Sequence, residues 1–137
     1  CVMQDAPSSP EIIDAISSLL KERILPKLEG HDVYALRVAI NSLGIVKREF
    51  ENRSDMEVGE KQRLELILGH SGTLEELNSE LCKKIRDGDF TLSDKPVLEH
   101  LKQTAMDQVT IDQPKYSGLI YAREQRSECQ TTQPPAP

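Results

Sequence analysis

The sequence predicts an all-α protein, a compact bundle of about five helices with a disordered C-terminal tail. Three observations predict this class. Apolar residues recur at three- and four-residue spacing along most of the chain, which is the period of a helix with one buried face. No segment alternates apolar and polar residues as a half-buried strand does. Proline, glycine and capping residues divide the chain into segments of helical length.

The first helix is expected to begin at Ser9 and Pro10, after a flexible lead-in of residues 1–8. Serine is a capping residue, and proline fits the first turn of a helix. The apolar stripe of this helix comprises Ile12, Ile13, Ile16, Leu19, Leu20 and Ile24. Pro26 lacks a backbone donor, so the helix should kink or end there, and Gly30 closes the segment.

Residues 32–52 and 55–68 are expected to form the second and third helices. The stripe of the second helix is Val33, Leu36, Ile40, Leu43 and Phe50, widened by Ala39 and Val46. Because this is the most apolar long segment, we place it at the centre of the fold. The inward residues of the third helix are Val58, Leu64, Ile67 and Leu68.

The fourth helix begins at Thr73, because Thr73 and Glu76 form a Thr-x-x-Glu capping box, and it stops at Gly88. The fifth begins at Ser93 or Asp94 and ends before Pro114. The expected inward residues are Leu74, Leu77, Leu81 and Ile85 in the fourth helix and Val97, Leu98, Leu101, Ala105 and Val109 in the fifth. These boundaries give a single helical domain over residues 9–118. Residues 119–137 form a largely disordered tail, because their end has too little apolar surface to order itself.

Composition and charge exclude several function classes. The 137 residues include 17 Lys and Arg against 23 Asp and Glu, a net charge of −6. A general nucleic-acid binder should be basic, so we expect no nucleic-acid partner. No apolar run approaches the ~20 residues of a membrane span, so we expect no membrane partner.

The cysteines and histidines lack the spacing of metal sites. The three cysteines, Cys1, Cys82 and Cys129, are widely separated, and neither His31 nor His70 has a second histidine nearby. We therefore expect no metal site and no disulfide framework, with Cys82 as a reduced, half-buried thiol. The first residues have no basic and apolar segments of a secretory signal, which favours a cytoplasmic location. A native start at Met3 and a cut from a longer polypeptide both stay open.

A polar strip on the second helix is the most unusual feature. On a helical wheel Arg37, Asn41, Gly44 and Arg48 fall between apolar residues on both sides. Guanidinium groups bind carboxylate or phosphate through paired hydrogen bonds, which predicts a small acidic ligand or an acidic partner segment. The favoured alternative is structural: Arg37 and Arg48 pair with carboxylates of a neighbouring helix, because acidic residues are plentiful.

Two weaker candidates lie near the C-terminal end of the predicted domain. His100, Thr104 and Asp107 line one side of the fifth helix, and a His–Asp pair suits acid–base chemistry. No Ser or Cys nucleophile is placed with them, so a solvated edge is the favoured interpretation, and we assign no catalytic residue. Tyr116 is expected to fold back onto the bundle and lock the chain end.

The chain resembles a bacterial domain family of unknown function over about residues 8–118. The resemblance rests on Glu11-Ile12-Ile13-Asp14-Ala15-Ile16, Leu25-Pro26-Lys27-Leu28-Glu29-Gly30, Tyr34-Ala35-Leu36-Arg37-Val38-Ala39-Ile40-Asn41, Ile45-Val46-Lys47-Arg48-Glu49, Arg63-Leu64, Leu68-Gly69, Ile85-Arg86-Asp87-Gly88, His100-Leu101 and Ile111-Asp112-Gln113-Pro114-Lys115-Tyr116. The family's Arg-Val-Ala-x-Asn pattern maps onto Arg37 and Asn41, and its Arg-Glu pair maps onto Arg48 and Glu49. The wheel singled out Arg37, Asn41 and Arg48. The resemblance adds Glu49 to them.

The resemblance implies a setting and no activity. Members of the family are short stand-alone proteins or tails of aminoglycoside-phosphotransferase-like kinases, often encoded beside such kinases and acyl-CoA dehydrogenases. It therefore implies acyl-CoA metabolism, with a kinase-like phosphotransferase or an acyl-CoA dehydrogenase as partner, and it implies no cofactor. The kinase's own catalytic His-x-Asp segment and phosphate loop are absent from this sequence. The leading hypothesis is a non-catalytic accessory domain that regulates such a kinase.

Three alternatives stay open. The first is a small-molecule binding module, in which Arg37, Asn41 and Arg48 hold an anionic metabolite such as a CoA ester. The second is a small enzyme that uses His100 and Asp107 with the arginines as anion clamps. The third is self-association as a homodimer, because small bundles often bury an extra apolar face that way. The candidate anion- or partner-binding residues are Arg37, Asn41, Arg48, Glu49, His100 and Tyr116.

Overall fold

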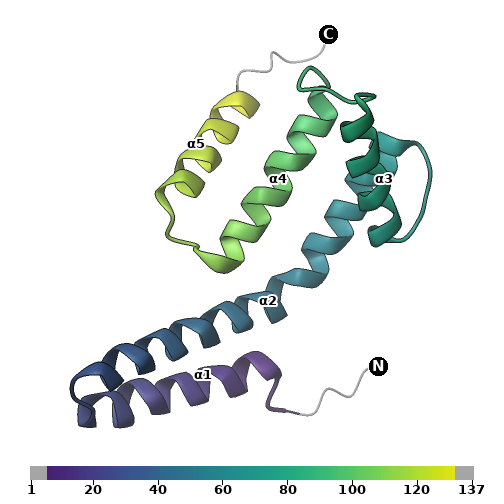
Figure 1. Cartoon of the computed structure of the whole chain (residues 1–137). Coiled ribbons are helices and arrows are strands. Elements are labelled where there is room, and N and C mark those ends of the chain that lie inside the picture. The colour runs from purple at the N-terminus through teal and green to yellow at the C-terminus, as the bar shows by residue number, and fades with distance from the viewer. Residues whose placement is uncertain (1–5, 132–137) are drawn as a thin grey trace. The chain divides into compact units, whose positions relative to one another are not determined.

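The predicted all-α class is confirmed. The computed structural model describes residues 6–131, with side chains as far as residue 125, and every regular element in that part of the chain is helical (Figure 1). The elements are α1 (Ser9–Leu19), the π-helical turn η1 (Leu20–Ile24), the 3-10 turn η2 (Leu25–Lys27), α2 (His31–Leu68), α3 (Leu74–Asp87), α4 (Lys95–Asp112) and α5 (Ser117–Thr131). Within the described residues, no helix combines the length and apolar content that a membrane span needs.

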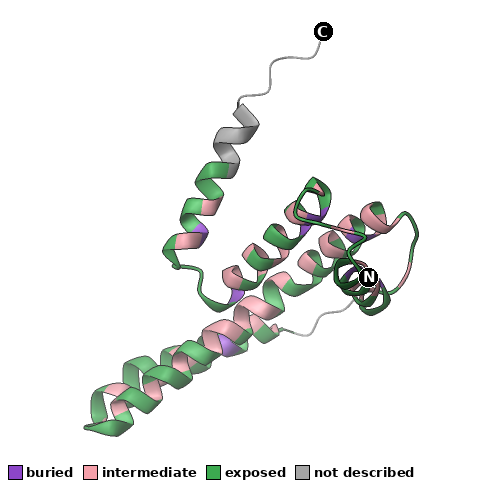
Figure 2. Ribbon diagram, turned by 45° about the horizontal axis from the view of Figure 1, so that its top comes forward, coloured by how far each residue is buried: buried purple, intermediate pink, exposed green. Residues whose placement is uncertain are grey.

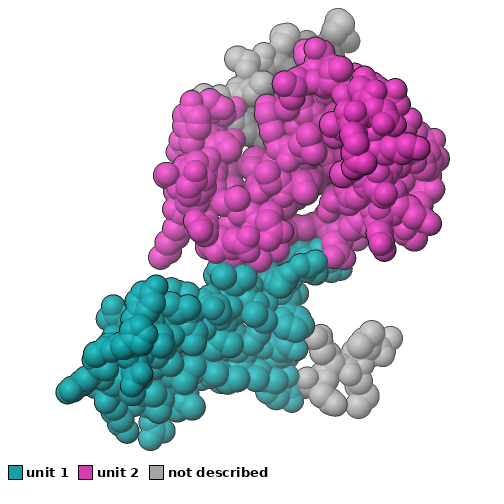
Figure 3. All heavy atoms as spheres, viewed as in Figure 1, with its two compact units in different colours: residues 1–55 teal, residues 56–137 magenta. Residues whose placement is uncertain are grey.

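The chain forms two compact units, residues 1–55 and residues 56–137 (Figure 3). Unit 1 is an antiparallel hairpin of α1 and the first part of α2, tied by the Lys47 ammonium 2.6 Å from the Asp14 carboxylate (Figure 1). Its first helix begins at Ser9, but the capping residue is Ser8, whose N–H donates to Glu11 at 2.7 Å. The expected change of helix at the proline is confirmed, because the chain passes through the π and 3-10 turns before Gly30 at φ +63°.

Unit 1 buries little of its apolar surface. Ile13 is the one buried residue that the structure describes in this unit, and no residue of α2 between 31 and 55 is buried. Exposed and intermediate positions accordingly make up most of this hairpin (Figure 2). Placing this segment at the centre of the fold was therefore wrong. The physical reason is that only α1 and its two short turns cover it within this unit, so its wide apolar stripe has one neighbouring helix where a bundle would supply two or three.

The expected break between the second and third helices does not occur, because α2 runs unbroken from His31 to Leu68. The polar segment at 52–55 contains no proline or glycine, and its side chains support the helix locally. The Asn52 amide donates to the Arg48 carbonyl at 2.7 Å, and Arg53 pairs with Glu49 one turn earlier. Polar residues whose side chains bond to groups one turn earlier on the same helix do not end that helix.

The end of α2 in unit 2 forms a hydrophobic core with α3 and the start of α4. This core consists of Leu64, Leu77, Leu81 and Val97, with Ile67, Leu68, Leu74 and Phe90 packed against it. The predicted limits of α3 are confirmed. The Thr73 hydroxyl accepts from the Glu76 N–H at 3.2 Å and the Thr73 N–H donates back to the Glu76 carboxylate at 3.0 Å, while Gly88 ends the helix at φ +84°.

The inward face of α4 differs from the prediction. Its buried residues are Val97, His100 and Ile111, whereas Leu101 is 44% exposed and Ala105 is also exposed. The inward positions 97, 100, 104, 107 and 111 keep a helical spacing, but three of them are polar. The prediction assigned apolar residues inward by default and missed that Arg63 offers these polar groups a partner.

The predicted tail is partly helical. Residues 117–131 form α5, and Leu119 is 3% exposed. Arg123 ties this helix to α4 by donating to the Thr110 hydroxyl at 2.9 Å. Residues 132–137, which are the remainder of the expected tail, lie outside the described residues, as does Cys1. Cys82 is exposed, so its expected half-burial was wrong.

Candidate functional site

A polar cluster joins α2 to α4 in unit 2, and Arg63 is its hub. The Arg63 Nε donates to His100 Nδ1 at 3.4 Å, and Nη2 donates to the Thr104 hydroxyl at 3.4 Å. The same Nη2 lies 3.7 Å from an Asp107 carboxylate oxygen. We call Arg63, His100, Thr104 and Asp107 the Arg63 cluster.

Local helix geometry places both halves of the cluster. On α4, positions 100, 104 and 107 are one helical turn apart on one face. On α2, Gly59 lies one turn before Arg63, and the Arg63 Nη1 lies 3.4 Å from the point where a β-carbon at Gly59 would be. The Arg63 guanidinium therefore lies along its own helix, against Gly59, at a distance that a β-carbon would also tolerate. Sequence reasoning missed Arg63 because its partner His100 lies 37 residues later in the chain.

The electrostatics of the cluster keep His100 neutral. Burial lowers the pKa of the His100 imidazole below its ordinary value, and the Arg63 guanidinium lowers it further, against a weaker opposing effect of Glu60. Because Nε of a guanidinium can only donate, Nδ1 of His100 is the acceptor and the ring proton is on Nε2. The expected solvated edge was wrong here, since His100 is 2% exposed.

The arrangement is suited to holding helices together. Asp107 does not pair with the imidazole in any described contact, because it accepts from Gln103 at 2.6 Å and lies beside Arg63. A histidine whose Nδ1 faces a guanidinium is a poor proton acceptor at that nitrogen, since the cation opposes a second positive charge. A partly buried polar network of this kind, with the buried His100 within it, fixes how two helices pack.

The predicted strip on α2 contains both exposed residues and a half-buried residue that contacts other groups. Arg37 and Asn41 are exposed, one turn apart, and Arg37 forms no ion pair with the described residues. Arg48 is half-buried and is engaged in polar contacts, and its Nη1 lies 3.3 Å from the β-carbon position of Gly44. Arg37 and Arg48 are separated by about 16 Å along the helix axis, so a single carboxylate does not bridge them.

The remaining predicted site residues lie apart from this strip. Glu49 is half-buried and pairs with Arg53 of its own helix. Tyr116 belongs to unit 2 and is 54% exposed. Its ring lies over Gly118, where a β-carbon would come 2.5 Å from Cε1, so Tyr116 packs on the start of α5. Among the described residues, no group of three or more His, Cys, Asp or Glu side chains is arranged to hold a metal.

Sequence reasoning also missed an exposed apolar surface on unit 1. Large apolar side chains of the hairpin stay accessible, among them Ile12 at 45%, Leu19 at 48% and Phe50 at 63% exposure. The hairpin face, as we define it, consists of Ile12, Ile16 and Leu19 on α1 and Ala39, Val46 and Phe50 on α2, all of them exposed.

Helix geometry places these residues on one side of the hairpin. On α1, Ile16 is offset by about 60° from Ile13, the buried residue that marks the inward side of this helix. On α2, Val46 is offset by about 100° in the same rotational sense from Lys47, which faces α1 through Asp14. Because the two helices run antiparallel, offsets of the same sense lie on the same side. The six residues therefore lie on one side of the hairpin, and none of them is charged.

Comparison with known families finds a match over the larger part of the chain. The model of a domain of unknown function, DUF6285, matches residues 26–116, which is about two thirds of the sequence. The matched range contains the strip on α2 and the Arg63 cluster, and it excludes α1. The curated proteins and the solved structures compared with the chain give no match.

Proposed function

The chain belongs to the DUF6285 family of domains of unknown function, and we propose that it is a non-catalytic accessory domain that binds a partner protein through the hairpin face. The proposed partner is a kinase-like phosphotransferase that works in acyl-CoA metabolism in the cytoplasm. The observation that carries this proposal is the set of exposed apolar side chains on one side of unit 1.

The hairpin face has the properties of a protein-binding surface. Soluble monomers rarely leave large contiguous apolar patches in water, and patches rimmed by polar residues mark interaction sites. Burial of such a surface contributes about 25 cal/mol per Å² of apolar area removed from water. A partner that covers the face supplies the second layer that unit 1 lacks, since Ile13 is the one buried residue among its described residues.

The Arg63 cluster supports a non-catalytic role. Its imidazole is buried and held by a guanidinium, so the His–Asp chemistry considered from the sequence has no support in the observed contacts. The identity of the partner class rests on the family resemblance of the sequence. An acyl-CoA dehydrogenase is the alternative partner from the same setting.

Co-elution on a sizing column tests the proposal. We expect the full chain to elute with the cognate kinase-like protein at micromolar concentration. Ile16→Glu places a charge in the hairpin face and should abolish co-elution. Ile120→Glu is the matched control, because Ile120 is exposed to a similar degree on α5, outside the face. Separate elution of the unmodified chain, or equal binding by both variants, contradicts the proposal.

A second candidate function is a binding module for an anionic metabolite such as a CoA ester. It is favoured by the exposure of Arg37 and Asn41 on successive turns of α2. A thermal-shift screen with CoA esters tests it, because a ligand at 100 times its dissociation constant stabilises the folded state by about 2.7 kcal/mol. The shift should disappear in Arg37→Ala. Absence of a shift with every ester, or an equal shift in that variant, excludes this function.

A further inference from the structure

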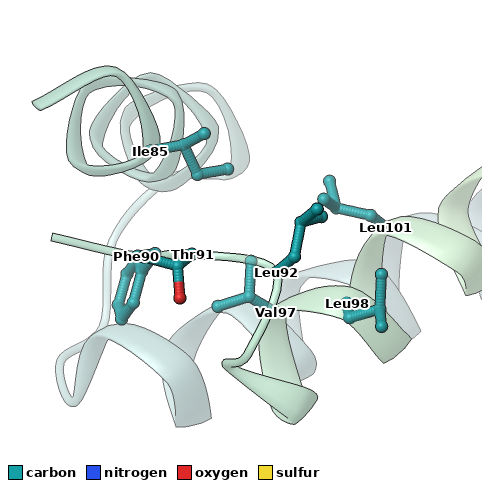
Figure 4. Close-up of a pocket in the computed structure, with 7 residues that line it drawn as sticks. All are labelled: Ile85, Phe90, Thr91, Leu92, Val97, Leu98 and Leu101. Atoms are coloured by element: carbon teal, nitrogen blue, oxygen red, sulfur yellow. The ribbon is translucent and has the colours of Figure 1, made fainter. Parts of the chain in front are cut away.

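A small apolar hollow lies in unit 2, between the end of α3, the turn that follows it and the start of α4 (Figure 4). Its volume is about 190 Å³, and it is lined by Ile85, Phe90, Thr91, Leu92, Val97, Leu98 and Leu101. Val97 is 4% exposed and belongs to the core of the unit, so the hollow opens directly onto that core. Leu92 and Leu101 are exposed and stand at its rim.

The walls of the hollow are held by hydrogen bonds from outside it. The turn is closed by the Asp94 N–H, which donates to the Thr91 carbonyl at 3.1 Å. The Asp94 carboxylate accepts from the Thr91 N–H at 2.7 Å. At the other wall, the Phe90 N–H donates to the Lys84 carbonyl at 3.4 Å. The turn therefore fixes Leu92, which is 84% exposed, in water beside the opening.

The hollow offers no free polar group to a ligand. Thr91 is the single polar residue in its lining. The Thr91 hydroxyl donates to the Asp94 carboxylate at 3.2 Å and accepts from the Ser93 N–H at 3.2 Å. The remaining lining side chains are aliphatic or aromatic. The hollow therefore recognises its occupant by shape and by burial of apolar surface.

We propose that this hollow binds the hydrocarbon group of a small molecule. A closed apolar cavity of about 150 Å³ binds benzene. The hollow is open to solvent at its rim, and its volume of about 190 Å³ has room for a benzene ring with a small substituent or an alkyl group of equal size. The same volume is too small for a helix, whose diameter with side chains is about 10–12 Å. The site is separate from the hairpin face, so the proposal does not depend on the proposed partner.

Methyl-detected NMR titration of the full chain with toluene tests this site. We expect saturable shifts of the Ile85, Val97 and Leu98 methyl signals. Pyrazine, a polar ring of similar shape, should bind at least several-fold more weakly. Leu101→Phe fills the hollow from its rim and should weaken toluene binding at least several-fold. Ile120→Phe is the matched control, because it enlarges an equally exposed side chain outside the hollow and should leave binding unchanged.

Three results overturn the proposal. The first is the absence of saturable methyl shifts up to the solubility limit of toluene. The second is equal binding of toluene and pyrazine. The third is a shift of the same methyl signals with protein concentration alone, since that makes a second copy the occupant. If Leu101→Phe fails to fold, Leu92→Ser removes a rim side chain that is already exposed, and unchanged toluene binding in that variant also overturns the proposal.

Discussion

Acidification below pH 6.5 should destabilise unit 2 through His100. Burial and the Arg63 guanidinium hold the pKa of the folded-state imidazole below its ordinary 6.5. The unfolded chain, whose histidine has that ordinary pKa, binds the proton first, so the free energy of unfolding falls as the pH drops from 6.5 through the folded-state pKa. A single proton limits the slope to about 1.4 kcal/mol per pH unit. Above pH 6.5 both states are neutral and His100 adds no slope.

The His100→Asn variant isolates this effect. The asparagine oxygen can accept from the Arg63 Nε in place of Nδ1, and it has no proton to gain in this range. We expect a lower overall stability, because the smaller side chain leaves a gap, together with loss of the slope below pH 6.5. Urea unfolding followed by circular dichroism across the pH range measures both quantities. An acid slope as steep in the variant as in the parent protein would refute the reasoning.

His70 supplies an internal contrast within the same unit. Its Nδ1–H faces the Ser71 carbonyl at 3.3 Å and its Nε2–H faces the Glu80 carboxylate at 2.8 Å. Both contacts favour the protonated ring, and they raise its pKa, with the Ser71 carbonyl as the larger cause. This stabilisation is complete below the ordinary pKa and is lost as the pH rises through the raised value. His70→Gln should therefore lower the stability below pH 6.5 by a constant amount, without changing the slope there, and should remove the loss of stability as the pH rises above 6.5.

Three further substitutions test the packing and the helix ends, each by urea unfolding of the variant against the parent protein. Leu77→Ala removes a side chain that is 0% exposed and should cost about 2–5 kcal/mol, whereas Leu66→Ala, at an 85% exposed position, should stay within about 0.5 kcal/mol. Gly88→Ala forces a β-carbon into φ +84° and should cost about 1–2 kcal/mol, and no loss would contradict the left-handed stop. Thr73→Ala removes the capping box of α3 and should cost about 1 kcal/mol, with a neutral result arguing that water replaces the hydroxyl.

The helix ends were predictable where a local interaction sets them. Thr73 with Glu76 and the left-handed Gly88 were found from sequence because capping depends on residues within one turn. The continuity of α2 was missed because Asn52 and Asp55 are weak helix formers by type, and the bonds of Asn52 and Arg53 to the preceding turn show only in the structure. Local sequence rules therefore located the helix caps. They wrongly predicted a helix end at residues 52–55, where side chains bond to their own helix.

Three residues of the Arg63 cluster could be predicted from the sequence, but their contacts with Arg63 could not. The sequence grouped His100, Thr104 and Asp107 on one face of a helix, as the structure does. It could not show that this face points inward, because that depends on Arg63, 37 residues earlier in the chain. The exposed hairpin face was missed for the converse reason: an apolar stripe predicts burial, and whether enough neighbouring helices exist to cover it is a tertiary property.

Two glycines in α2 lie one turn before an arginine whose guanidinium rests against them, Gly44 before Arg48 and Gly59 before Arg63. A glycine within a helix is less favourable than alanine by about 1 kcal/mol. A β-carbon at Gly44 would come 3.3 Å from Arg48 Nη1, so that guanidinium would have to shift slightly, whereas the distance of 3.4 Å from a β-carbon at Gly59 to Arg63 Nη1 is an ordinary van der Waals contact. A search for stabilising substitutions guided by helical propensity should therefore take Gly59→Ala before Gly44→Ala.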